Sequence, residues 1–234
     1  KQFYLRFYFY SMAFENEIEN IRKKIEGYKN EGKTMFAGSS FQTHSIPMLH
    51  ILAQIDKTIP VYFLNTGYLF PQTIEYKDEI ATLFELKVID QKSSTPRHMQ
   101  KDENGRLLFT SDPDFCCHLN KVAPMEPILH SYDIWINGVR ADQNANRAKM
   151  KEEQQTPQGA MRYHPMLHWT KQMIWSYIKE YNIPHHPLDA AGYTSIGCEP
   201  CTRKIDTSQM GDERMARWFG LNKTECGLHT ELIK

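Results

Sequence analysis

The alternation of short apolar runs with longer segments of helical periodicity constrains the fold most. Apolar runs at residues 34–37, 60–65 and 87–90 have the length and composition of buried strands. The segment 46–55, between the first two runs, repeats its apolar side chains at helical spacing. Because neighbouring parallel strands need a crossover connection, usually a helix, this alternation predicts an α/β fold with a parallel, twisted sheet flanked by helices.

Other segments extend this pattern. Apolar periodicity predicts helices over residues 18–28 and 169–182, and the apolar run at 132–138 predicts a fourth strand. Residues 91–106 are polar and broken, so we expect an irregular excursion there. The segment 139–162 is charged and polar, and we expect a long loop beyond the carboxyl end of the fourth strand.

Composition excludes several classes of protein. The 234 residues are 41% hydrophobic and 24% charged, which is ordinary for a globular protein. The 28 basic and 28 acidic residues balance, so the bulk positive charge of a nucleic-acid-binding protein is missing. No apolar run reaches the ~18 residues that a membrane span needs. We therefore expect a soluble protein that binds neither nucleic acid nor membrane.

Polar loops follow the first, second and fourth predicted strands. In open parallel sheets, ligands bind beyond the carboxyl ends of the strands, so the three loops are expected to form one site. Hydroxyl groups ahead of a helix suit a phosphate, a threonine–glycine turn suits a nucleotide, and two arginines suit an anion. A plain helix cap, an ordinary turn and a solvated charged loop remain the alternatives. The candidate binding residues are Ser39, Ser40, Phe41, Thr66, Gly67, Arg140 and Arg147.

The five cysteines fall into two close pairs and one single residue. Cys116 and Cys117 are adjacent, and Cys198 and Cys201 form a C-x-x-C pair, which leaves Cys226 alone. A disulfide between neighbours is a poor staple, because its preferred geometry holds the two Cα atoms well apart. The odd number without an export signal indicates a reducing compartment, and we expect a cytoplasmic protein. Spacing alone leaves a zinc ion, an iron–sulfur cluster and incidental thiols as alternatives.

Two features favour a 4Fe–4S cluster over zinc. Zinc usually takes its cysteines as C-x-x-C pairs, because two intervening residues let both sulfurs converge on one point, whereas adjacent sulfurs diverge more easily onto two metal atoms. Four thiolates around a cluster also leave negative charge, and Lys121 lies one helical turn after Cys117 on the same face. We therefore expect one 4Fe–4S cluster held by Cys116, Cys117, Cys198 and Cys201.

Several motifs along the chain resemble those of one enzyme family. They occur in matching order and read FQTHS, LNTGYLFPQT, CCHLNKVAP, GVRADQNANRA, HPMLHWT, GYTSIGCEPCT, GDERMARW and ECGLH. In these motifs the chain resembles the sulfonucleotide (PAPS) reductases, and among them the cluster-containing adenylyl-sulfate (APS) reductases of assimilatory sulfate reduction and cysteine biosynthesis. The resemblance implies an adenine nucleotide α-hydrolase-like fold of the PP-loop type, with a flexible C-terminal segment.

The resemblance also implies a reaction at sulfur. APS and two electrons from reduced thioredoxin, or a similar dithiol, would give sulfite and AMP. Cys226 would be the nucleophile and form an S-sulfocysteine, with Lys121 and His229 as further catalytic residues. Thiolate and substrate are both anions, so cations should line the sulfate and lower the pKa of Cys226, against the effect of Glu225. The other candidate cations are Arg203, Arg214, Arg217 and Lys223.

The expected organisation is one domain followed by a catalytic segment. Residues 1–11 are aromatic-rich and precede Met12, and we expect a non-native or disordered N-terminal extension, with an edge strand as the alternative. Residues 12–206 would form a single α/β nucleotide-binding domain that includes the cluster site. Residues 207–234 would form the C-terminal segment that carries the catalytic cysteine. The sequence leaves open whether the chain forms a homo-oligomer.

Departures from related families bear on the alternative functions. ATP pyrophosphatases have an SGGxDS loop where this chain has SFQTHS, with Phe41 and Gln42 in place of both glycines. Close backbone approach to a pyrophosphate is therefore not expected, and Asn65 stands where many relatives carry aspartate. A reductase of the 3′-phosphorylated substrate (PAPS) typically lacks both cysteine pairs. PAPS reductase, ATP pyrophosphatase or sulfur-transfer enzyme, and non-catalytic binding module remain the alternatives.

Overall fold

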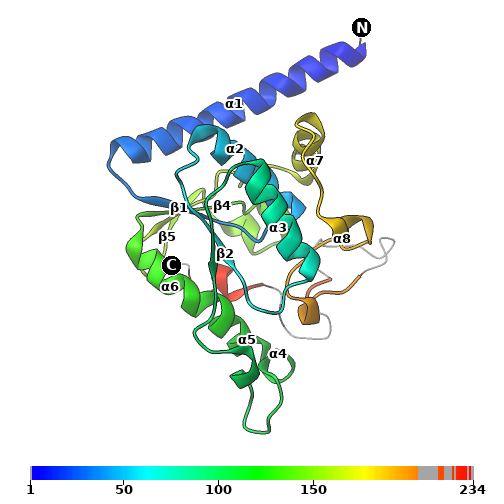
Figure 1. The fold of residues 1–234 in the computed structure, drawn as a ribbon. Helices are drawn as coiled ribbons and strands as arrows, with labels where there is room; N and C mark the ends of the chain where they lie inside the picture. The colour runs from blue at the N-terminus through cyan, green and yellow to red at the C-terminus, as the bar shows by residue number, and fades with distance from the viewer. Residues whose placement is uncertain (1, 205–215, 219–222, 224, 231, 233–234) are drawn as a thin grey trace.

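A mostly parallel sheet forms the centre of the protein, for which a computed structural model describes residues 2–204, 216–218, 223, 225–230 and 232 (Figure 1). Among these residues, six strands pair in the order β3-β2-β1-β4-β6-β5. The strands are β1 Met35–Gly38, β2 Val61–Leu64, β3 Val88–Gln91, β4 Ile134–Asn137, β5 Glu153–Gln155 and β6 Met161–Tyr163. Neighbouring strands run parallel except for β5, which is antiparallel to β6. The predicted α/β fold is confirmed.

Different helices cover the two faces of the sheet, because side chains alternate along each strand. The helices are α1 Gln2–Asn30, α2 Ile46–Ile55, α3 Pro71–Leu83, α6 Ala123–Ser131 and α7 Lys171–Glu180. Ala37 and Ile136 pack on one face with α1, α2, α3 and α7. Phe36 and Trp135 pack on the other face with α6. Figure 1 shows α1 along the upper side of the sheet and α6 along its lower side.

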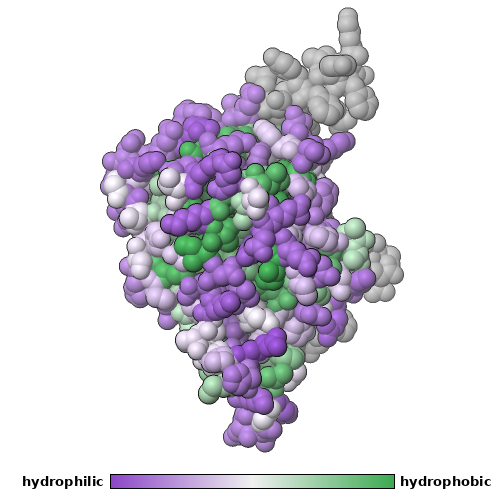
Figure 2. Space-filling view, in the orientation of Figure 1, coloured by the Kyte–Doolittle hydropathy of each residue, from purple (hydrophilic) through white to green (hydrophobic). Residues whose placement is uncertain are grey.

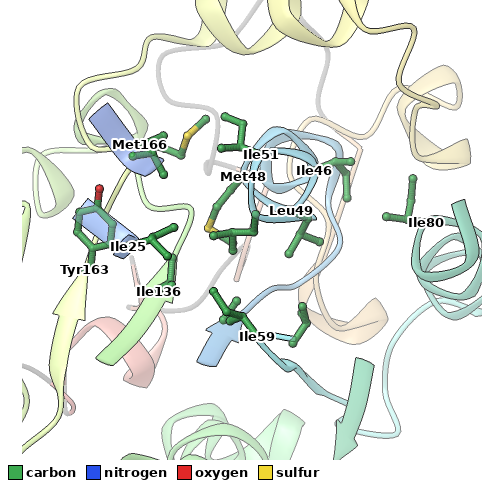
Figure 3. Packing of buried hydrophobic residues seen from close by; sticks show 14 of the residues in the cluster. Ile25, Ile46, Met48, Leu49, Ile51, Ile59, Ile80, Ile136, Tyr163 and Met166 are labelled. Atoms are coloured by element: carbon green, nitrogen blue, oxygen red, sulfur yellow. The ribbon is translucent and has the colours of Figure 1, made fainter. Parts of the chain in front are cut away.

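Helix α2 lies at the centre of the main core. Its predicted apolar positions are confirmed as buried, apart from Ile55, which is partly buried. The buried positions are Ile46, Met48, Leu49, Ile51 and Leu52. Figure 3 shows this helix packed among Ile25 of α1, Ile80 of α3 and Ile136 of β4. Each fully buried Ile or Leu contributes roughly 1.5–3 kcal/mol, so this layer fixes the strands whose ends carry the site.

Some segments differ from the sequence-based expectation. The predicted loop 139–162 contains β5 and the start of β6, because β5 is a polar edge strand without the apolar alternation that marks a strand. Residues 2–11 belong to α1, so the alternative of an N-terminal edge strand is wrong. Between β3 and α6 the chain forms short helices that the sequence did not indicate. They are α4 Leu108–Ser111, α5 Pro113–Cys117 and the π-helical turn η3 His118–Val122.

The visible surface is mostly polar. Figure 2 shows hydrophilic residues over most of one face, with smaller apolar patches between them. Within the described part of the chain, no helix combines the length and the hydropathy needed to cross a membrane.

Candidate active site

A large cavity opens beyond the carboxyl ends of β1, β2 and β4. Its volume is about 1290 Å³, its open mouth included, and the last residues of these strands, Gly38, Leu64 and Asn137, line it. Strands β1 and β4 are neighbours at the centre of the sheet, where the strand order reverses. Open α/β sheets bind ligands at this point. All three predicted loops contribute lining residues, as their positions indicated.

The loop after β1 turns its hydroxyl groups and its phenyl ring in different directions. Ser39 and Ser40 line the cavity, and Ser39 Oγ accepts a hydrogen bond from the backbone N–H of Phe41 at 3.1 Å. Phe41 has a φ of +51°, a left-handed conformation that favours glycine. Its ring is fully buried, with its centroid 5.6 Å from that of Phe63. The structure thus places the ring of Phe41 in the core against Phe63, and a role of this residue in substrate binding stays a prediction.

The other two loops each turn one candidate residue into the cavity. Thr66 lines it, whereas Gly67 forms a turn with a φ of +74° and lies outside its described lining. Arg147 lines the cavity as well. Arg140 is fully buried outside that lining, and its Nε donates to Asp142 Oδ1 at 2.9 Å. Arg140 therefore supports the loop, and its contact with substrate stays a prediction.

Arg147 holds C-terminal residues against the cavity through an ion pair with Glu225. Arg147 Nε donates to Glu225 Oε2 at 2.9 Å, and Nη2 donates to Oε1 at 3.1 Å. The two side chains are 7% and 1% exposed. Glu225 also accepts from Asn144 Nδ2 and from the backbone N–H of Cys226, both at 2.9 Å. Arg147 thus offsets the negative charge of Glu225 that was expected to oppose ionisation of Cys226.

A second cavity, of about 340 Å³, is lined by Cys116, Cys117, Cys198 and Cys201. All four are free thiols; the first three are buried and Cys201 is half-buried. Among the described residues, no three His, Cys, Asp or Glu side chains converge closely enough to hold a single metal ion. Zinc needs its sulfur ligands at about 2.3 Å from one point. The four thiols around this cavity are the side chains that could hold a metal centre here.

Short helical segments position the first cysteine pair and Lys121. Helix α5 begins after Asp112, whose carboxylate accepts from the backbone N–H of Phe115 at 2.9 Å. The π-helical turn η3 follows, and π-helical turns are frequent at functional sites. In this turn Asn120 Nδ2 donates to the carbonyl of Cys116 at 2.9 Å. Lys121, also in η3, lines both cavities.

Lys121 carries its charge in the wall between the two cavities. Thr66, Lys121 and Cys198 line both of them. Burial lowers the pKa of Lys121, but the thiolate forms of Cys226, Cys198 and Cys117 outweigh burial and raise this pKa overall. A cation here therefore lies beside both the cysteine pairs and the large cavity.

Cys226 lies next to the first cysteine pair. It lines the large cavity and is 8% exposed. Its thiol shares a hydrogen bond with the thiol of Cys117, and this bond and burial raise the pKa of Cys117. Burial lowers the pKa of the neighbouring Lys223, but a hydrogen bond to Asp114 and the thiolate forms of Cys117 and Cys226 raise it overall. The single cysteine therefore lies close to the charged groups of Lys121 and Lys223.

The three arginines predicted near the C-terminus differ in position. Arg217 is buried and lines the large cavity, and its guanidinium lies against Gly197. A Cβ on Gly197 would stand 2.1–2.4 Å from guanidinium atoms, so glycine leaves the space that Arg217 occupies. Arg203 is exposed outside the described lining of the cavity and donates to the carbonyl of Thr202 at 3.1 Å. Arg214 lies outside the described residues.

His229 is oriented by an arginine that the sequence did not single out. Arg162 of β6 is fully buried with its guanidinium 4.3 Å from the ring centre of Trp135. It donates to the carbonyl of Leu228 at 3.0 Å and shares a hydrogen bond with His229 Nδ1. Burial and the charge of Arg147 lower the pKa of Arg162 to about 9, so it is still charged at neutral pH. In the sequence, only the position of Arg162 between the apolar residues Met161 and Tyr163 could have indicated that this arginine is buried.

Comparisons with known proteins give one consistent family. A family model described as "phosphoadenosine phosphosulfate reductase domain" matches residues 34–204, which include both cysteine pairs. An "adenosine 5′-phosphosulfate reductase" of Chelativorans sp. is 39% identical over 213 residues, 89% of this chain and 84% of that protein. A protein of the same name from Bacillus cytotoxicus is 32% identical over 226 residues, 94% of this chain and 96% of that protein.

Solved structures agree with the fold. A phosphoadenylyl-sulfate (PAPS) reductase from Candida auris gives a TM-score of 0.66 at 18% identity, over 76% of this chain and 87% of that chain. An NH3-dependent NAD synthetase from Campylobacter jejuni gives 0.52 at 12% identity, over 74% of each chain. At these identities the likeness concerns the fold alone, and it confirms the expected PP-loop-like architecture.

Proposed function

Since the chain belongs to the phosphoadenosine phosphosulfate reductase domain family, we propose that it reduces adenosine 5′-phosphosulfate (APS) to sulfite and AMP. The protein is an oxidoreductase that acts on a sulfur group, within assimilatory sulfate reduction and cysteine biosynthesis. One observation carries the proposal: Cys226 lines the large cavity together with Lys121 and Arg217. A thiolate that attacks an anion needs cations at this position.

In the first step, the Cys226 thiolate attacks the sulfate sulfur of APS. A sulfur–sulfur bond forms, the bond from sulfur to the phosphate oxygen breaks, and its electron pair leaves with AMP. Lys121 and Arg217 stabilise the sulfate oxygens as charge shifts to the leaving group. Because Arg162 donates to Nδ1 of His229, the proton of neutral His229 lies on Nε2, and this N–H donates a hydrogen bond to an oxygen of the substrate.

In the second step, a dithiol protein such as thioredoxin releases sulfite. One of its thiolates attacks Sγ of the Cys226 S-sulfonate, which expels sulfite and leaves a mixed disulfide. Its second thiolate breaks the mixed disulfide and restores the Cys226 thiolate. The dithiol thereby loses two electrons and the sulfate sulfur gains two. Free thiols persist in a reducing compartment, and we assign the reaction to the cytoplasm on that ground.

The four paired cysteines are the residues that would hold one 4Fe–4S cluster. Their free thiols surround a common cavity, which fits a centre of several metal atoms. When bound, the cluster supplies negative charge and a rigid anchor for the turn that carries Lys121. The two electrons of the reaction come from thiol exchange. Iron and acid-labile sulfide analysis of anaerobically purified protein distinguishes this cluster from zinc.

The test of the proposed function is the Cys226→Ser variant. We expect dithiol-dependent sulfite release from APS to vanish in this variant, while its iron and sulfide content equals that of the unmodified protein. Serine keeps the size of the side chain and removes the thiolate. Full activity in Cys226→Ser would show that the nucleophile is another group.

A side-by-side assay of APS and PAPS tests the main alternative. We expect a strong preference for APS, because both cysteine pairs that typically distinguish APS reductases are present. Comparable kcat/KM values for the two substrates would assign the chain to the broader sulfonucleotide class instead. The same assay with ATP tests the pyrophosphatase alternative, and no release of pyrophosphate is expected.

A further inference from the structure

The amide of Asn137 lies buried at the end of β4, where the large cavity begins. The residue is 5% exposed and its side chain lines the cavity. Neither Oδ1 nor Nδ2 meets a hydrogen-bond partner among the described residues. Buried amides almost always have partners, because an unpaired donor or acceptor costs free energy. A buried donor and acceptor without a partner among the described residues therefore indicate a contact with the ligand of this cavity.

A second group of this kind lies on the same face of β4. Trp135 precedes Asn137 by two residues, and its indole N–H is also buried without a partner in the described part of the chain. It lines the same cavity. Gly38, which is opposite Asn137 in the pairing of β1 with β4, keeps this wall open. A Cβ on Gly38 would stand 2.7 Å from Trp135 Nε1.

The wall formed by Gly38, Trp135 and Asn137 is uncharged, whereas cations line the cavity elsewhere. Charged side chains suit the sulfate and the phosphate. A neutral amide suits an uncharged group that both donates and accepts hydrogen bonds. Adenosine offers two such groups: the edge of adenine, where N6 donates and a ring nitrogen accepts, and the hydroxyls of ribose.

We infer that Asn137 binds the adenosine part of the substrate through a paired donor and acceptor contact, and that it contributes to selection of the nucleotide. The inference rests on the proposed function, because that function supplies an adenine nucleotide as the ligand. Asn137 is assigned to binding and not to the chemistry at sulfur. Its loss should therefore raise KM for APS and leave kcat at saturating substrate nearly unchanged.

Calorimetric titration of the holoprotein with AMP tests this contact, because AMP keeps the nucleotide and cannot react. We expect Asn137→Leu, which removes both polar atoms at similar size, to weaken AMP binding about tenfold or more. Inosine 5′-monophosphate, 2′-deoxyAMP and 3′-deoxyAMP each remove one candidate partner. The analogue that lacks the true partner should bind more weakly than AMP to the unmodified protein but equally well to the variant.

The measured quantity is the ratio of AMP affinity to analogue affinity, compared between the unmodified protein and Asn137→Leu. A ratio for inosine 5′-monophosphate that falls to about one in the variant identifies the adenine edge as the partner. The same fall for a deoxy analogue identifies a ribose hydroxyl. The inference would be overturned if these ratios were the same in the variant and in the unmodified protein for every analogue, or if the variant bound AMP as tightly as the unmodified protein. The proposed function would stand in either case. Failure of the unmodified protein to bind AMP and to release sulfite from APS would overturn both. The smaller variant Asn137→Ser repeats the test if leucine does not fit.

Stability of the ligand-free protein provides the matched control. Asn120 is also buried, but its Nδ2 donates to Gln100 Oε1 at 2.6 Å and its Oδ1 accepts from Gln100 Nε2 at 3.0 Å. Asn120→Leu should lower the Tm, because it removes both hydrogen bonds between Asn120 and Gln100 and leaves Gln100 Oε1 without this donor. Asn137→Leu should not lower the Tm, because within the described part of the chain its amide has no hydrogen bond to lose. An equal drop in both variants would show that Asn137 is structural and would overturn the inference.

Discussion

The Arg147–Glu225 pair makes a quantitative prediction about access to Cys226. Glu225 is the residue before Cys226, and its carboxylate binds both Arg147 and the backbone N–H of Cys226. The second step of the proposed reaction requires a dithiol protein to reach a thiol that is 8% exposed. The C-terminal residues must therefore open, and breaking the ion pair should favour the open state.

The structure gives the size of this effect. Both side chains are almost fully buried, and the pair is bidentate. Removing one partner of a buried ion pair costs about 3–5 kcal/mol, because it leaves the other charge uncompensated. Each 1.4 kcal/mol is about a tenfold change in population. Glu225→Gln keeps one carbonyl acceptor, so we expect a cost at the lower end of this energy range. That cost corresponds to an increase of about 100-fold in the population of the open state.

The assay is the rate at which iodoacetamide alkylates Cys226 in the holoprotein, measured by mass spectrometry of the peptide. Glu225→Gln and Arg147→Gln form a matched pair, because they change the local charge in opposite directions. If charge alone controlled the thiol, loss of the carboxylate would speed alkylation and loss of the guanidinium would slow it. If the ion pair holds the segment closed, both variants should be alkylated faster.

Opposite changes in the two variants, or rates equal to that of the unmodified protein, would refute the role of the pair in closure. The double variant carries two neutral amides that can pair with each other. It should be alkylated more slowly than either single variant, because no charge is left buried without a partner.

Three further predictions concern the surroundings of the site. Lys121→Ala should lower kcat/KM for APS without changing iron content, whereas Cys117→Ser should lower kcat/KM and iron content together. An equal loss of iron in the two variants would contradict a catalytic role for Lys121. Gly38→Ala should lower the free energy of unfolding in urea by about 1–3 kcal/mol, because its Cβ would meet Trp135 Nε1 at 2.7 Å, and unchanged stability would contradict it. Burial lowers the pKa of His186 from 6.5 to about 4, so between these pH values the unfolded chain binds more protons than the folded chain. The free energy of unfolding should therefore fall by up to about 1.4 kcal/mol for each pH unit from pH 6.5 down to pH 4. The same pH profile in His186→Asn would argue against this.

Sequence patterns predicted the layers of the fold and the position of the site, because these depend on local periodicity and on the polarity of strand ends. They did not predict which arginine of a loop faces the ligand. Arg140 and Arg147 lie in one polar segment, yet Arg140 is buried beside Asp142 and Arg147 lines the cavity. This difference arises from tertiary partners such as Glu225, which is 78 residues from Arg147 in the chain.

Residues inside strands were missed for a related reason. Arg162 and Asn137 are single polar residues in short strands, where the sequence gives no sign of the side chain's environment. Arg162 bonds to His229, 67 residues away in the chain, and Asn137 faces a cavity that forms only when distant loops meet. The burial of a polar group without a local partner is visible only in the folded chain, and it marks both residues as candidates for function.

The position of Lys121 connects the two cavities electrostatically. Thiolates of the paired cysteines and the anionic substrate would lie on either side of a wall formed by Thr66, Lys121 and Cys198. As a general scale, two negative charges at a separation of about 8 Å repel by roughly 2 kcal/mol at an effective dielectric constant near 20. The cation of Lys121 lies between the thiolates and the substrate anion and attracts both, which offsets this repulsion. In the proposed reaction, we therefore expect the cysteine pairs to influence the substrate through the charge of Lys121.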